Sequence, residues 1–143
     1  MSDELVLAIS GNDIFSGGGL HADLATFTTN KQNGFVAITC LTAMTENGFE
    51  VIPIDSKVFK QQLDSLKDVP FSAIKIGLLP NVEIAELTLL FKHREKLLVL
   101  TVIETEIIAV RARVRQHLAP CGATDSCFIF HNMNNLGSST WEN

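Results

Sequence analysis

The sequence is poor in cysteine and has no long apolar run, and these two absences exclude several classes of protein. Three cysteines are too few for a disulfide framework, and we expect them to stay reduced. No stretch approaches the roughly 20 apolar residues that span a bilayer. The start, Met-Ser-Asp-Glu, is acidic and does not resemble a secretory signal peptide. We therefore expect a cytoplasmic protein without a membrane partner.

Basic residues are also scarce. Eleven Lys and Arg stand against 16 Asp and Glu, which gives a net charge of −5. So acidic a chain has no overall electrostatic attraction to nucleic acid, and we expect no such partner. It can still hold a small anion through backbone N–H groups. Residues 101–143 contain no lysine, although they hold three arginines. This shift in composition suggests that the tail has a different history from residues 1–100.

What the sequence does contain is a regular alternation of apolar runs and amphipathic stretches. With 143 residues, 46% of them hydrophobic, the chain suits one globular domain with a real core. The alternation predicts βαβ units, and therefore an α/β protein with a mostly parallel sheet. Strands are expected at residues 5–10, 35–41, 51–54, 71–77 and 97–100. Helices are expected at residues 19–30 and 56–66 and from residue 82, with a weaker one at 105–118. Residues 42–49 are expected to form a loop.

A glycine-rich loop after the first apolar run is the strongest local signal. Residues 11–19 contain four glycines, and a predicted helix begins where they end. Ligands of open parallel sheets bind beyond the carboxyl ends of the strands, where glycine permits close approach and the helix start offers free N–H groups. Asp13, the one charged residue of the loop, could accept a hydrogen bond from a substrate hydroxyl or ring nitrogen. The alternative is a turn that only connects strand to helix.

The glycine spacing narrows the kind of ligand. It matches neither G-x-G-x-x-G nor G-x-x-x-x-G-K-[ST], so a Rossmann or Walker nucleotide site is not supported.

However, residues 8–27 (AISGNDIFSGGGLHADLATF) resemble the signature of the pyridoxal and hydroxymethylpyrimidine kinases, a branch of the ribokinase-like superfamily. Further segments resemble the same family in register, namely residues 38–44, 53–63 and 73–80. The resemblance covers about residues 4–100 and implies a ribokinase-like three-layer α/β/α sandwich.

The resemblance also implies an activity. Members of the family transfer the γ-phosphoryl group of ATP, with Mg²⁺, to a hydroxymethyl group on a small aromatic heterocycle. The family often dimerises, so a homodimer is expected. By correspondence with the family's motifs, the substrate-binding residues are expected to be Gly11, Asp13, Gly18, Thr42, Met44 and Leu78.

Position 44 bears on the choice of substrate. Hydroxymethylpyrimidine kinases typically have Gln there, which can bond an aminopyrimidine edge, whereas Met44 offers a soft apolar surface. This favours pyridoxal or pyridoxine, but one position leaves both substrates open. Core packing is the alternative role for Met44. Lys75 is interpreted either as a residue near phosphate or as a strand-end lysine with its ammonium in water. His21 is expected on the surface.

The C-terminal features of the family are not recognisable. The strand ending at residue 100 leads into residues 101–104 (TVIE), where the family carries an Asp, and no glycine-rich phosphate loop follows. Residues 120–127 echo such a loop only weakly, and Cys121, Cys127 and His131 are one ligand short of a zinc site. We therefore expect a substrate-binding part at residues 1–100, a divergent tail at 101–143, and no assignable catalytic residue. An inactive fragment of a truncated or frameshifted kinase gene is the alternative to a working kinase.

Overall fold

Parallel strands and helices alternate along the chain, as the apolar pattern predicts. The structure, a computed structural model, describes residues 4–91 and 97–102. The elements are β1 (Leu5–Ser10), α1 (Gly19–Thr29), β2 (Asn33–Ile38), β3 (Cys40–Thr45), β4 (Gly48–Pro53), α2 (Ser56–Leu66), β5 (Ala73–Leu79), α3 (Val82–Leu89) and β6 (Leu97–Val102). Four of the strands form a parallel sheet in the order β2-β1-β5-β6. The predicted α/β class is confirmed.

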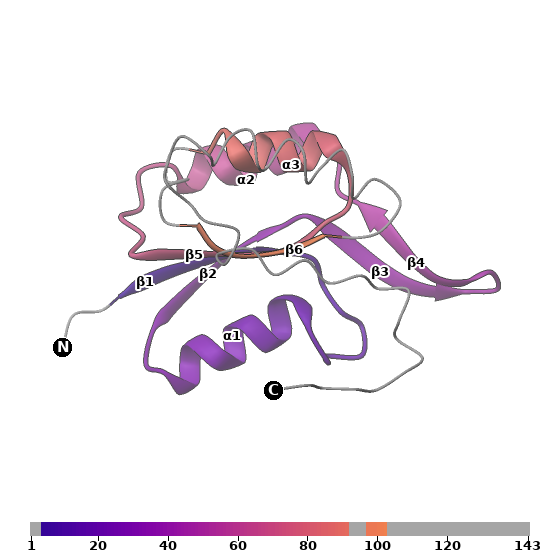
Figure 1. The fold of residues 1–143 in the computed structure, drawn as a ribbon, viewed down its shortest axis with the longest axis horizontal. Helices are drawn as coiled ribbons and strands as arrows, with labels where there is room; N and C mark the ends of the chain where they lie inside the picture. Colours follow the sequence, from indigo (N-terminus) through magenta and orange to yellow (C-terminus); the bar gives the residue numbers. More distant parts are fainter. Residues whose placement is uncertain (1–3, 92–96, 103–143) are drawn as a thin grey trace.

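The sheet lies between two helical layers, which Figure 1 shows with α1 on one face and α2 beside α3 on the other. The main core lies under α2 and α3. Its largest fully buried side chains are those of Phe59, Phe71, Leu7, Ile9, Ile74, Ile76, Leu79, Ile84 and Leu89. Burial of each such side chain stabilises the fold by about 1.5–3 kcal/mol. This core fixes the sheet and therefore the loops at the ends of its strands.

Polar side chains cap the starts of two helices. The Asp55 carboxylate accepts hydrogen bonds from the backbone N–H groups of Lys57 (3.0 Å) and Val58 (3.1 Å) at the start of α2. Asn81 accepts one from Ile84 (2.9 Å) at the start of α3. These caps satisfy N–H groups that have no partner inside the helix. Both predicted helix starts are therefore confirmed.

The segment predicted as a loop at residues 42–49 is instead part of a β-hairpin. The second strand of the main sheet ends at Ile38, and β3 and β4 then pair antiparallel as a separate two-stranded sheet. In Figure 1 this hairpin extends past the helices. The prediction was wrong because the polar residues of the segment hide the turn signal Asn47-Gly48. The turn needs a glycine, since Gly48 has a φ of +105°.

Several predictions from the sequence concern residues outside the described ranges. These are the helix at 105–118, the loop-like stretch at 120–127 and the weak zinc candidate that includes His131. The expected boundary between residues 100 and 101 falls inside β6. In the described part of the chain, no helix is long and apolar enough to cross a membrane.

Candidate substrate site

The glycine-rich loop follows β1, at the point where the strand order of the sheet reverses. After β1 the chain continues into β2, which pairs with β1 on one side, whereas β5 pairs with β1 on its other side. The carboxyl end of β1 is thus flanked by two strands whose connections run to opposite sides. In open α/β sheets such switch points are where ligands bind. The topology therefore supports the ligand-binding interpretation of the loop over that of a simple connection.

Two glycines of this loop are fixed by close packing. A Cβ on Gly11 would stand 2.3 Å from Sγ of Cys40 and 3.6 Å from Cδ2 of Leu78. A Cβ on Gly19 would stand 2.4 Å from the carbonyl oxygen of Gly11, and Gly19 has a φ of +61°. Leu20 N–H donates to that same oxygen at 2.9 Å. The first turn of α1 is therefore held tightly against the end of β1.

Asn12 fastens the loop to the hairpin. The backbone N–H of Thr42 donates to Oδ1 of Asn12 (2.7 Å), and the Thr42 hydroxyl donates to the Asn12 carbonyl oxygen (3.2 Å). The N–H of Asn12 in turn donates to the carbonyl oxygen of Cys40 (3.1 Å). The N–H of Ile14 donates to the Thr42 hydroxyl oxygen (3.3 Å). Together these bonds hold loop and hairpin as one unit around Thr42.

The carboxylate of Asp13 is only partly used inside the loop. Its Oδ1 accepts from the N–H of Phe15 at 2.9 Å, which stabilises the turn. Its Oδ2 would lie 3.5 Å from a Cβ on Gly17 and 3.8 Å from one on Gly18, ordinary contact distances. No described residue is hydrogen-bonded to Oδ2, so this oxygen can accept from a ligand. Gly18 is the N-cap residue of α1, which has no side-chain cap.

Of the predicted site residues on the strands, Thr42 and Leu78 contact the loop, whereas Met44 lies further along the hairpin. Thr42 is buried, and Leu78 at the end of β5 approaches Gly11 and accepts a 2.7 Å hydrogen bond from the Thr39 hydroxyl through its carbonyl oxygen. Met44 lies two residues beyond Thr42 on β3 and is 57% exposed. Core packing as the role of Met44 is therefore wrong, because its side chain lies largely in solvent.

Lys75 is paired with α1. Its Nζ lies 2.9 Å from each carboxylate oxygen of Asp23, and the two side chains are 26% and 12% exposed. The interpretation of Lys75 as a strand-end lysine with its ammonium in water is wrong, because it stands third of the seven residues of β5 and binds a carboxylate. A role near phosphate stays a prediction. His21 is exposed, as expected.

Sequence reasoning missed three residues that shape this site. No local sequence pattern marks the roles of Asn12, Gly19 and Cys40. Asn12 and Cys40 act through contacts with partners distant in the sequence, and Gly19 is required because of its φ. A loop asparagine followed by aspartate was the one available hint for Asn12.

The buried thiol of Cys40 gives a pH-dependent prediction. Burial raises the pKa of Cys40 above its ordinary value of 9.0, partly offset by the hydrogen bond from Thr39. Above that ordinary value the thiol ionises in the unfolded chain before it does so in the folded one. The free energy of unfolding should therefore fall as the pH rises above about 9, by up to about 1.4 kcal/mol per pH unit. Urea unfolding of wild type and Cys40→Ala between pH 8 and 10 measures this, and equal slopes would contradict it.

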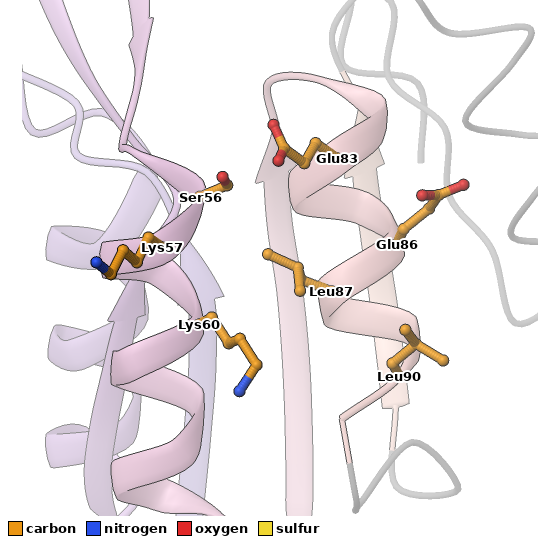
Figure 2. A pocket seen from close by; sticks show the side chains of 7 residues that line it. All are labelled: Ser56, Lys57, Lys60, Glu83, Glu86, Leu87 and Leu90. Atoms are coloured by element: carbon orange, nitrogen blue, oxygen red, sulfur yellow. The ribbon is translucent and has the colours of Figure 1, made fainter.

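A separate hollow of about 330 Å³ lies between α2 and α3, on the far side of the sheet from α1. Figure 2 shows Lys57 and Lys60 on α2, and Glu83, Glu86 and Leu87 on α3. None of the predicted site residues lines it, so this hollow is separate from the candidate site at the glycine loop.

The fold is that of an α/β protein with a candidate small-molecule site at the switch point of a parallel sheet. The sequence matches the phosphomethylpyrimidine kinase family over residues 13–109. The chain therefore belongs to this family, and the resemblance read from its motifs is confirmed. It is 38% identical over 91 residues to pyridoxine kinase of Bacillus subtilis, which is 61% of this chain and 34% of the relative.

The chain is similar to further members of the family. The chain is 42% identical over 83 residues to hydroxymethylpyrimidine/phosphomethylpyrimidine kinase of Haemophilus influenzae, covering 57% of this chain and 31% of the relative. The crystal structure of an ADP complex of Bacillus subtilis pyridoxal kinase is similar with a TM-score of 0.70 and 30% identity, over 84% of this chain and 50% of that one. The ribokinase-like fold is thus confirmed. The chain spans about a third of the length of these curated relatives.

Proposed function

We propose that the chain acts in the ATP-dependent phosphorylation of the hydroxymethyl group of pyridoxal or pyridoxine, or of hydroxymethylpyrimidine and its phosphate. The observation that carries this is the glycine loop at the switch point, joined through Asn12 to Thr42 of the hairpin, in a chain of this kinase family. In the reaction the bond between the γ-phosphorus of ATP and its bridging oxygen breaks. A bond from the substrate hydroxyl oxygen to phosphorus forms, and the hydroxyl proton is released with ADP.

The residues of the site would bind and orient the heterocycle. Oδ2 of Asp13 is available to accept a hydrogen bond from a ring hydroxyl or a protonated ring nitrogen. Met44, rather than a glutamine, places a polarisable apolar group beside the ring, and this favours pyridoxal over an aminopyrimidine. Leu78 and Gly11 would limit how far the ring enters the site. Phosphoryl transfer relies mainly on positioning and charge stabilisation, and these residues supply the positioning of the acceptor.

The phosphate donor would be ATP, consistent with the ADP bound to the Bacillus subtilis neighbour. Mg²⁺ would be held largely by the phosphates of ATP and by water, since among the described residues no group of three His, Cys, Asp or Glu could hold a metal ion by itself. No catalytic residue is identified within residues 4–91 and 97–102.

The test separates binding from turnover. The chain is titrated with pyridoxal and with hydroxymethylpyrimidine by calorimetry, and then incubated with ATP, Mg²⁺ and each ligand while ADP and the phosphorylated product are measured. Asp13→Ala should weaken pyridoxal binding about tenfold or more, because it removes a charged hydrogen-bond acceptor. Asp64→Ala, on the exposed face of α2, is the matched control.

Each outcome decides part of the proposal. Product formation supports the kinase activity. Binding without product from a folded chain overturns turnover by this chain and leaves an inactive fragment that keeps the substrate site. The absence of any heat at millimolar ligand overturns the proposal as a whole.

A homodimer and a cytoplasmic location are further parts of the proposal. Among the described residues β6 lies at the edge of the sheet with β5 as its neighbour, and an edge strand can pair with a second copy. Sedimentation equilibrium at several concentrations tests the dimer, and a monomer mass throughout would contradict it.

A further inference from the structure

The strand register of the β3–β4 hairpin shows which side chains lie on each of its two faces. Met44 pairs with Phe49, Thr42 with Val51, and Leu41 with Ile52. Side chains alternate between faces along a strand, and cross-strand partners share a face. One face therefore carries the pair Met44 and Phe49 together with Thr42, whereas Leu41 and Ile52 lie on the opposite face.

Hydrogen bonds to the loop identify which face belongs to the substrate site. The Thr42 hydroxyl donates to the carbonyl oxygen of Asn12 and accepts from the N–H of Ile14, so the side chain of Thr42 points at the glycine loop. Met44 and Phe49 are on that same face. They lie one pleat further along the hairpin, about 7 Å from Thr42 along the strand.

The pair is apolar and open to solvent. Met44 is 57% exposed and Phe49 is 41% exposed, although each is a large hydrophobic side chain. On the loop itself, Ile14 is 44% and Phe15 is 66% exposed. Neighbouring exposed apolar groups that border polar site residues are typical of a ligand-binding surface.

We infer that Phe49, on the same face as Met44, contacts the face of the substrate ring and so contributes to the choice of heterocycle. This inference rests on the proposed function. An aromatic heterocycle has polar edges and apolar faces, and the site offers both kinds of contact. Asp13 can bond an edge, while a phenyl ring and a thioether are the groups that pack best on an aromatic face. The continuity of the pair with the loop through Thr42 favours a ring over a second copy of the chain.

The test compares the two faces of the same strand. Pyridoxal is titrated into wild type, Phe49→Ala and Ile52→Ala by calorimetry without ATP. Ile52 is 46% exposed and lies on the opposite face, so its variant controls for loss of an exposed apolar side chain from β4. Phe49→Ala should raise the dissociation constant about tenfold, and Ile52→Ala should leave it unchanged.

A second variant separates ring contact from hairpin stability. Phe49→Leu keeps an apolar side chain but has no ring current, so the upfield shifts that we expect for bound pyridoxal protons should disappear while the thermal melt stays unchanged. Equal shifts in wild type and Phe49→Leu would overturn the inference, as would equal binding by Phe49→Ala and Ile52→Ala. A loss of self-association in Phe49→Ala with unchanged pyridoxal affinity would assign the face to a second copy and also overturn it. If wild type binds no pyridoxal, the proposed function itself fails.

Discussion

Gly19→Ala should destabilise the protein by about 2–5 kcal/mol and abolish the ordered start of α1. Two costs add at this position. A φ of +61° is disfavoured for alanine by about 1–2 kcal/mol. Its Cβ would also overlap the carbonyl oxygen of Gly11 at 2.4 Å, and forced overlap in a packed region costs about 1–3 kcal/mol. The oxygen belongs to the backbone and already accepts from Leu20, so it cannot move aside easily.

Gly17→Ala is the matched control within the same loop. Its Cβ would meet only Oδ2 of Asp13, at an ordinary contact distance of 3.5 Å. Alanine at a compatible position restricts the unfolded chain and is neutral or slightly stabilising. Thermal unfolding followed by circular dichroism should place Gly19→Ala roughly 5–15 °C below Gly17→Ala. Pyridoxal binding should be lost only in Gly19→Ala. Equal melting temperatures would contradict the close contact between Gly19 and Gly11.

The regular elements could be predicted from local sequence because local chemistry determines them. Asp55 and Asn81 mark helix starts through hydrogen bonds to residues two or three positions away, which any reader of the sequence can propose. The continuous apolar run of β1 indicates a strand buried on both faces. The hairpin was missed because Thr42 and Thr45 look like loop residues until their hydroxyls are seen bonded to Asn12 and Glu50.

The site could be predicted only in part, because several of its contacts join residues far apart in the chain. The family motifs point to Gly11, Asp13 and Thr42, and the structure brings these together at the end of β1. The bond between Asn12 and Thr42 spans 30 residues, and no periodicity encodes it. The exposure of a side chain also cannot be derived from the sequence, so core packing stayed open as an alternative to the favoured role of Met44 on a ligand face.

The ion pair between Lys75 and Asp23 joins positions 52 residues apart and ties α1 to β5. Small residues lie beside Lys75 in the sheet. Ala8 is the register partner of Lys75 on β1, and a Cβ on Gly77 would lie 3.1 Å from Nζ. These small neighbours leave space for the lysine to reach α1 across the face of the sheet. Both charges are mostly withdrawn from water, so each depends on the other for stabilisation.

Removing either partner alone should therefore be costly. Asp23→Asn and Lys75→Met should each lower the free energy of unfolding by about 2 kcal/mol, less than for a fully buried pair because Lys75 keeps some contact with water. The double variant should lose less than the sum of the two, since no unpaired charge remains. Urea unfolding of all four proteins measures this coupling. Lys60→Met, which breaks an exposed pair with Asp64 on α2, is the control and should change stability by less than about 0.5 kcal/mol. Strict additivity of the two single changes would show that the pair does not hold α1 on the sheet.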